Sequence, residues 1–126
     1  MSSWTAINAA IRFDHLSVVQ GPFDPFFGHT CTYEDGEAEW EQCDVPNGSE
    51  GSLQYKYVEY PDNENALVQG SLVIWGDLRD FEEADHPQVI EYLTRICEDR
   101  EVRSGIAQLN EQVYAYDRES STWKKA

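Results

Sequence analysis

Hydrophobic and polar residues alternate along three stretches of the chain, the pattern expected of strands with one buried face. Residues 4–13 alternate first, and residues 52–60 and 67–75 alternate again later. The sequence Pro-Asp-Asn at 61–63 is a turn signal. The pattern therefore predicts a strand near the N-terminus and a later hairpin. In the second arm of that hairpin, Val73 and Trp75 face one side, and Leu72 and Ile74 face the other.

A helical period of apolar residues follows at 85–100. Asp85 suits the N-cap and Pro87 suits the first turn, so the helix is expected to begin there. Its apolar stripe consists of Val89, Ile90, Leu93, Ile96 and Cys97. A last long strand is predicted from about Val102 to Tyr116. Residues 119–126 are expected to be a flexible C-terminal tail.

The segment Gln20–Glu50 is rich in Pro, Gly and acidic residues and has no clear period. Within it, residues 35–43 (DGEAEWEQC) suit a short helix anchored by Trp40. The resulting order is strand, irregular segment, strand, strand, helix, strand. We therefore predict a single α+β domain over residues 1–118, with an antiparallel sheet and one main helix in a ferredoxin-like, split β-α-β arrangement.

Composition supports a folded domain without a membrane span. The chain has 126 residues, 40% of them hydrophobic, which is enough for one core. No stretch reaches the roughly 20 apolar residues that cross a bilayer, and the N-terminus lacks the features of a signal peptide. We expect a cytoplasmic protein, in the host cell if it is viral, with Cys31, Cys43 and Cys97 as reduced thiols.

The net charge of the chain limits the classes of binding partner that it can have. Nine Lys and Arg against 24 Asp and Glu leave a formal net charge of −15. Such a surface repels nucleic acid, whose binding depends on Lys and Arg contacts to phosphates. It attracts basic protein surfaces and speeds their encounter. Solubility, or life in a salty cytoplasm, explains the same charge equally well.

A zinc site is the first chemistry to weigh. His29, Cys31 and Cys43 offer three ligands, with Cys97 or His15 as a fourth. Structural zinc sites usually show closely spaced ligand pairs such as C-x₂-C, and the only close pair here is His29-x-Cys31. Buried thiols that behave as small hydrophobic groups are the commoner explanation. No metal and no cofactor is therefore predicted.

Other catalytic signals are equally sparse. The loop NGSEGS at 47–52 has the glycines of a phosphate cradle but lacks the Lys and the following helix of a P-loop, so it is interpreted as a turn. No histidine lies in a nucleophile motif, and the many carboxylates do not single out a catalytic pair. We predict that the protein is not an enzyme.

The stretches Val45–Tyr55 (VPNGSEGSLQY) and Trp75–Phe81 (WGDLRDF) resemble a group of small uncharacterised proteins from bacteriophages and prophages. The resemblance covers about the middle two thirds of the chain. It implies no catalytic residue. It implies a context in which small acidic proteins, such as anti-CRISPR and other anti-defence inhibitors, occupy basic nucleic-acid channels of host machinery.

These observations give a leading hypothesis: an acidic phage-type protein that mimics nucleic acid and inhibits a basic, nucleic-acid-handling host defence protein. Its predicted partner-binding residues are Glu34, Asp35, Glu37, Glu39, Trp40, Glu41, Asp44 and Glu50, with Tyr33 as a second aromatic anchor. The alternative is a small-ligand binding protein, such as a sponge for a nucleotide immune signal. In that case Arg12, Arg79 or Arg103 would contact the phosphates.

A homodimer is also expected. If helices cover one sheet face, the other carries Val73 and Trp75, together with several of Tyr55, Tyr57, Tyr114 and Tyr116. An apolar face of that size is normally covered. Either the segment Gln20–Glu50 folds across it or a second copy does, and we favour the second copy because the segment is so acidic.

Overall fold

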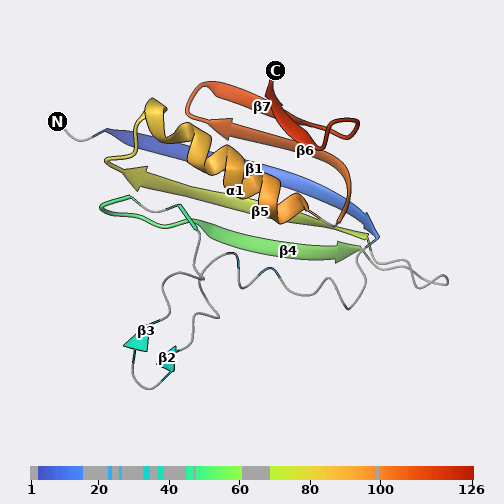
Figure 1. Cartoon of the computed structure of the whole chain (residues 1–126), viewed down its shortest axis with the longest axis horizontal. Coiled ribbons are helices and arrows are strands. Elements are labelled where there is room, and N and C mark those ends of the chain that lie inside the picture. The colour runs from blue at the N-terminus through green and yellow to red at the C-terminus, as the bar shows by residue number, and fades with distance from the viewer. Residues whose placement is uncertain are drawn as a thin grey trace.

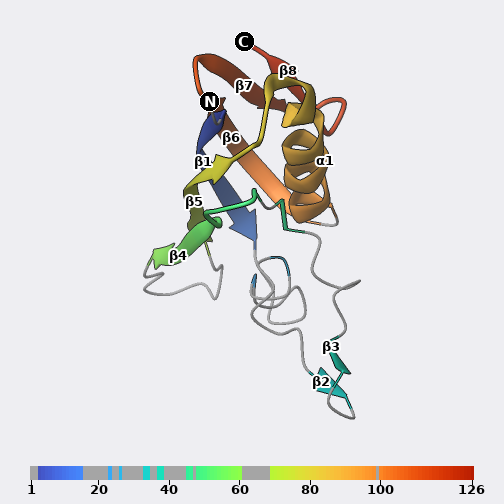
Figure 2. The same cartoon turned by 90° about the vertical axis from the view of Figure 1, so that its left-hand side faces the viewer.

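The computed structural model describes residues 3–15, 23, 26, 33–34, 37–38, 45–46, 48–60, 69–98 and 100–126. Six strands form one antiparallel sheet in the order β4-β5-β1-β6-β7-β8. Helix α1 (His86–Cys97) crosses one face of this sheet, as Figures 1 and 2 show. The strands are β1 (Trp4–His15), β4 (Gln54–Tyr60), β5 (Gln69–Arg79), β6 (Glu101–Leu109), β7 (Gln112–Asp117) and β8 (Thr122–Lys125).

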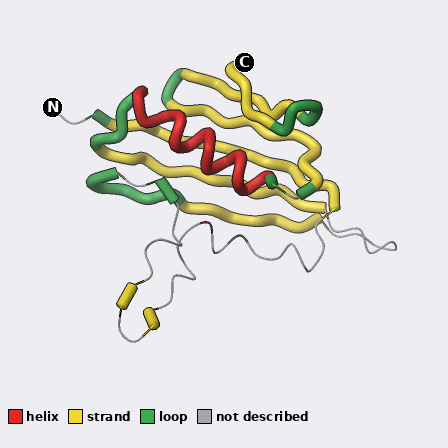
Figure 3. Tube along the Cα trace, viewed as in Figure 1, coloured by secondary structure: helices red, strands yellow, loops and turns green. Residues whose placement is uncertain are grey.

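The α+β class and the antiparallel sheet with one main helix agree with the prediction. The finer ferredoxin-like arrangement is not established, since the described residues hold six strands in this sheet and one α-helix. Figure 3 shows how little of the described chain is helical. A second, two-stranded sheet pairs β2 (Tyr33–Glu34) with β3 (Glu37–Ala38). The short helix predicted over 35–43 is therefore wrong at Glu37–Ala38.

Strand β1 is central to the main sheet. Its residue Ile7 is in register with Gly76 of β5 on one side and with Leu109 of β6 on the other. Its inward side chains are Thr5, Ile7, Ala9, Ile11 and Phe13, all buried. The alternation that predicted this strand thus corresponds to a real division between a core face and an opposite face.

Helix α1 covers the core face. Asp85 is at its N-cap and Pro87 is in its first turn, as predicted. Val89, Leu93, Ile96 and Cys97 are buried against the sheet, and so are His86 and Tyr92. Because the α-helix has 3.6 residues per turn, these positions lie on one side of the helix.

Aromatic residues complete the core beside the helix. Phe23 is 3% exposed, and its ring centroid lies 5.3 Å from that of Phe13 and 5.2 Å from that of Tyr57. The Arg100 guanidinium lies 5.0 Å from the centroid of Phe23 and 5.2 Å from that of Phe26. The Tyr92 hydroxyl donates a hydrogen bond to the Phe26 carbonyl. Phe23 and Phe26 thus tie part of the irregular segment to the core face.

The predicted single strand from Val102 to Tyr116 is instead a hairpin. β6 ends at Leu109 and β7 begins at Gln112. Asn110 has a left-handed backbone (φ 53) that makes the turn. The side-chain oxygen of Asn110 accepts a hydrogen bond from the backbone N–H of Ala6 at 2.8 Å. The backbone N–H of Asn110 donates to the Ala6 carbonyl at 2.9 Å. These bonds hold the turn against β1.

Residues after Arg118 were expected to form a flexible tail, but Thr122–Lys125 form β8 on the edge of the sheet. Trp123 is 6% exposed and packs edge-on against Tyr116, with ring centroids 5.5 Å apart. The indole lies over Gly105, where a Cβ would come within 2.6 Å of it. A single buried Trp therefore anchors this strand.

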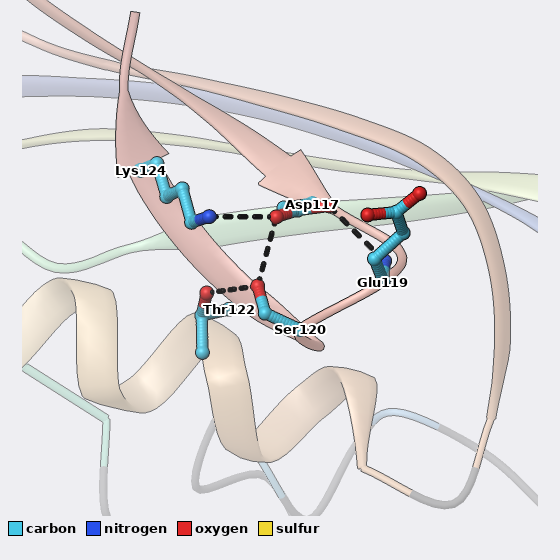
Figure 4. A network of polar contacts seen from close by, with 5 residues as sticks. All are labelled: Asp117, Glu119, Ser120, Thr122 and Lys124. Carbon is cyan, nitrogen blue, oxygen red and sulfur yellow. Dashed lines mark hydrogen bonds and ion pairs between the residues drawn. The ribbon is translucent and has the colours of Figure 1, made fainter.

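A polar turn positions β8 (Figure 4). The Asp117 carboxylate accepts hydrogen bonds from the Ser120 hydroxyl at 2.9 Å and the Glu119 amide at 3.1 Å, and it pairs with Lys124 at 2.8 Å. The hydroxyls of Ser120 and Thr122 lie 2.6 Å apart. The bonds from Lys124 and Ser120 lower the pKa of Asp117 to about 2. A carboxylate that accepts several hydrogen bonds in this way organises the turn.

Candidate interaction surfaces

The predicted partner-binding cluster falls mostly outside the described residues. Glu34 and Glu37 are described by their backbones and lie opposite each other in the β2–β3 pairing. Glu50 is described completely. The other predicted positions lie outside the described residues, namely Asp35, Glu39, Trp40, Glu41 and Asp44.

Glu50 is fixed to the end of β5. Its carboxylate pairs with the Arg79 guanidinium at 2.6 Å, with both side chains well exposed. The Arg79 amide donates to the Glu50 carbonyl at 3.0 Å, and the Ser49 amide donates to the Arg79 carbonyl at 2.9 Å. The Ser49 hydroxyl donates to the Asp80 carboxylate. Glu50 thus takes part in a local contact and is also accessible from outside.

The glycines of the NGSEGS loop allow this close contact with β5. Gly51 has a left-handed backbone (φ 84), and a Cβ there would lie 1.9 Å from the Asp77 carbonyl oxygen. At Gly48 a Cβ would lie 2.4 Å from the Arg79 carbonyl oxygen. Both glycines are therefore explained by backbone packing against a strand. This fits the interpretation of the loop as a turn.

Two of the arginines considered for a phosphate ligand are already paired with carboxylates. Arg79 pairs with Glu50, and Arg103 lies 3.3 Å from the Asp14 carboxylate. A phosphate would have to compete with those carboxylates. The alternative of a nucleotide binder gains no support from these two side chains.

The zinc candidates do not assemble among the described residues. His29, Cys31 and Cys43 lie outside them, and no group of three or more His, Cys, Asp or Glu suited to a metal occurs in the part of the chain that is described. Cys97 is buried on α1 as the helical pattern predicted. Burial raises the pKa of its thiol to about 12, so it stays protonated at neutral pH.

His86 is the described histidine with a defined side-chain environment. It is 4% exposed, and its Nε2 lies 3.3 Å from the Thr5 hydroxyl. That hydroxyl donates to the Phe81 carbonyl at 2.6 Å, so Nε2 must be the donor to Thr5. The ring borders a hollow of about 640 Å³ that also involves Trp4, Glu83 and Glu111. Burial lowers the pKa of His86, partly opposed by Glu83 and Asp85.

The face of the sheet opposite α1 is here called the open face. Its side chains form three central rows across the strands, defined by the pairing register. The rows are Gln54–Trp75–Asn8–Gln108–Val113, Lys56–Val73–Ala10–Ile106–Ala115–Lys124, and Val58–Ser71–Arg12–Ser104. The second row is apolar between its two terminal lysines, the first places Trp75 and Val113 among amide side chains, and the third carries Arg12 between two serines.

The open face is hollowed at its centre. One hollow of about 280 Å³ lies over Ala10, between Val73 of β5 and Ile106 of β6. A second hollow, also of about 280 Å³, shares Ala10 and Ile106 and reaches Arg12, Ser71 and Ser104. The small side chain of Ala10 creates this depression between taller neighbours.

The sequence correctly predicted Val73 and Trp75 on the open face, where they are 39% and 41% exposed. It was wrong about the tyrosines. Tyr55 and Tyr57 are in register with the buried Ile74 and Leu72, and so they face the core. Tyr114 and Tyr116 also pack against the core as partly buried residues. The apolar side chains that the prediction missed on the open face are Trp4, Val58 and Ile106.

Comparison with known protein families, with characterised proteins and with solved structures finds no match for this chain. Within the described residues, no helix has the length and apolar character needed to traverse a bilayer. The proposed function is therefore based on the sequence and on the surfaces described above.

Proposed function

We propose that this protein is a non-enzymatic, acidic binding protein that covers a basic surface of a nucleic-acid-handling protein. The net charge of −15 is the observation that carries the proposal. A basic channel that accepts a polyanion presents Lys and Arg side chains at its surface. An acidic protein surface can pair with the same side chains and exclude the nucleic acid. The resemblance to phage proteins makes a host defence effector the first partner to test.

Exposed carboxylates support this proposal beyond the predicted cluster. Glu82, Glu83 and Glu91 are exposed at the start of α1 and along its outer side. Within the predicted cluster, Glu50 contributes a carboxylate that is 60% exposed beside the end of β5. These groups keep most of their hydration, so charge attraction would act mainly on the rate of encounter.

The environments of two candidate catalytic side chains, Cys97 and His86, favour a binding role. A catalytic cysteine needs a lowered pKa, whereas burial raises the pKa of Cys97. A general base needs access to its substrate, whereas His86 is 4% exposed. Neither side chain has the environment that nucleophilic catalysis requires.

Capture by immobilised protein from a panel of purified nuclease effectors tests the proposal. We expect at least one effector to bind, with an affinity that falls as salt is raised from about 0.05 to 0.5 M, because ions screen exposed charges. Failure to bind any effector, or binding that is indifferent to salt, would contradict it.

Charge-matched variants locate the surface. The double variant Glu37→Gln/Glu39→Gln should weaken binding by about tenfold, if each carboxylate contributes somewhat less than 1 kcal/mol. The control Glu111→Gln/Glu119→Gln removes the same charge from turns elsewhere in the chain. Equal losses in the two variants would show that overall charge matters and that the predicted cluster does not.

A further inference from the structure

Exposed apolar side chains gather on the open face. Among the described residues, the large hydrophobic side chains that remain exposed are Trp4, Val58, Val73, Trp75 and Ile106. The pairing register puts all of them on the side away from α1. Ile106, at 55% exposed, is the most accessible of them. Val58, Val73, Trp75 and Ile106 lie in neighbouring rows, whereas Trp4 lies apart from them, opposite Arg79 at the start of β1. Neighbouring exposed apolar side chains on one face indicate an interface.

The same face is poor in negative charge. Its three central rows, all composed of described residues, contain no carboxylate, although the chain has 24 Asp and Glu. Carboxylates at its margins include Asp14, paired with Arg103, Asp117, paired with Lys124, and the exposed Asp77, which lies opposite Ala6 beyond the first row. Two copies of this chain can therefore meet through these central rows without bringing carboxylates together.

The described part of the irregular segment lies elsewhere. Phe23, Phe26 and Val45 pack with the core on the side of α1. Phe26 is also bonded to Tyr92 of α1 through its carbonyl. These residues therefore do not cover the open face.

The open face is close in area to a stable protein–protein contact. Six strands spaced about 4.8 Å apart make a sheet roughly 24 Å wide, and strands of about eight residues are roughly 26 Å long. The flat area is on the order of 600 Å², which side-chain relief increases. Stable interfaces bury about 800 Å² on each partner.

We propose that a second copy of this chain covers the open face, in a two-fold symmetric, sheet-on-sheet dimer. Such an interface must be self-complementary, since each copy offers the same patch. The open face meets this requirement because Ile106 projects from it beside the hollow over Ala10. In the dimer, Ile106 of each copy enters the hollow of the other, and Val73 packs beside it. This inference is independent of the proposed basic partner.

Light scattering and sedimentation equilibrium test the dimer directly. At high salt we expect twice the 14.5 kDa chain mass. Two chains of net charge −15 repel each other, so the dimer should dissociate more readily as salt is lowered. A basic partner shows the opposite salt trend, so the two proposals can fail separately.

Matched substitutions identify the face. Ile106→Lys should raise the dimer dissociation constant by at least about tenfold, the loss expected for a central interface residue. Gln88→Lys makes the same change of charge at an exposed position on α1 and should leave the constant unchanged. Val73→Lys provides a second test, and circular dichroism confirms that each variant is folded. A single-chain mass at every salt concentration, or a dimer that Ile106→Lys leaves intact, would overturn the proposal.

Discussion

His86 connects the start of α1 to β1 through one side chain. It donates to Thr5, and the groups around it are Glu83 and Asp85 before the helix and Lys125 on β8. Glu111 lies in the lining of the same hollow. Burial is the largest effect on the ring, and it favours the neutral imidazole. The carboxylates only partly offset it, so the pKa in the folded protein lies below 6.5.

Acidification should therefore destabilise the fold through His86. The unfolded chain takes up this proton near pH 6.5, before the folded chain does. Stability contributed by neutral His86 is complete above pH 6.5 and is lost as pH falls below it, with a slope of at most about 1.4 kcal/mol per pH unit. Urea unfolding between pH 8 and 5.5 measures this loss.

The variant His86→Gln provides the control. Its side-chain amide can donate to Thr5 but does not titrate, so the slope between pH 8 and 5.5 should become nearly flat. An unchanged slope would show that other groups cause it. Asp117 does not interfere, because its pKa is lowered and its contribution is lost only below about pH 3.8.

The stability of the fold also depends on the backbone conformation of a single residue, Gly51. Replacing it by Ala puts an L side chain at φ 84 and against the Asp77 carbonyl. We expect Gly51→Ala to destabilise the fold by at least about 1–2 kcal/mol. The neighbouring exposed Ser52→Ala should change stability by no more than about 0.5 kcal/mol. Equal urea midpoints for the two variants would contradict the packing role assigned to the loop.

Among the elements, the short edge strand β8 is expected to contribute to the free energy of unfolding through Trp123. Trp123→Ala removes a buried indole from between Tyr116 and Gly105. It should cost about 3–5 kcal/mol of unfolding free energy, the range for large-to-small changes in a core. Lys125→Ala, at an exposed position in the same strand, should have little effect. If Trp123→Ala behaves like Lys125→Ala in thermal or urea unfolding, β8 is dispensable.

Elements with a sustained period were predictable from the sequence. Apolar and polar residues alternate along strand β1, and apolar residues recur at helical spacing along α1. The order of residues therefore predicts which side chains are buried. The β6–β7 hairpin was missed because its turn consists only of Asn110 and Glu111. That turn shifts the alternation, so Tyr114 and Tyr116 face the core whereas a continuous strand would turn them outward.

Contacts between distant segments could not be predicted in this way. Nothing near Trp123 indicates that Gly105 lies beneath it, and the buried Phe23 sits in a stretch without a period. The candidate surface was predicted in part. Val73 and Trp75 followed from alternation, but Trp4, Val58 and Ile106 joined them only through the strand order. Most of the acidic cluster lies outside the described residues and stays a prediction.

At the scale of the molecule, the exposed large apolar side chains of the described residues lie on the open face, whereas Glu82, Glu83 and Glu91 are exposed before and along α1. A dimer through the open face leaves these carboxylates free for a basic partner, so the two proposed contacts do not exclude each other. A dimer would present two acidic surfaces at once. If a partner offers two basic sites within reach, the second contact forms at a high effective concentration and the complex tightens without any new type of contact.

The central place of β1 also sets the order in which the chain can fold. β1 is synthesised before its neighbours β5 and β6, which follow much later in the chain, since Ile7 pairs with Gly76 and Leu109. The β4–β5 and β6–β7 hairpins can form locally, whereas the strand that joins them must wait for both. Distant pairings of this kind slow folding and leave strand edges exposed meanwhile. Synthesis of nearly the whole chain must therefore precede closure of the sheet.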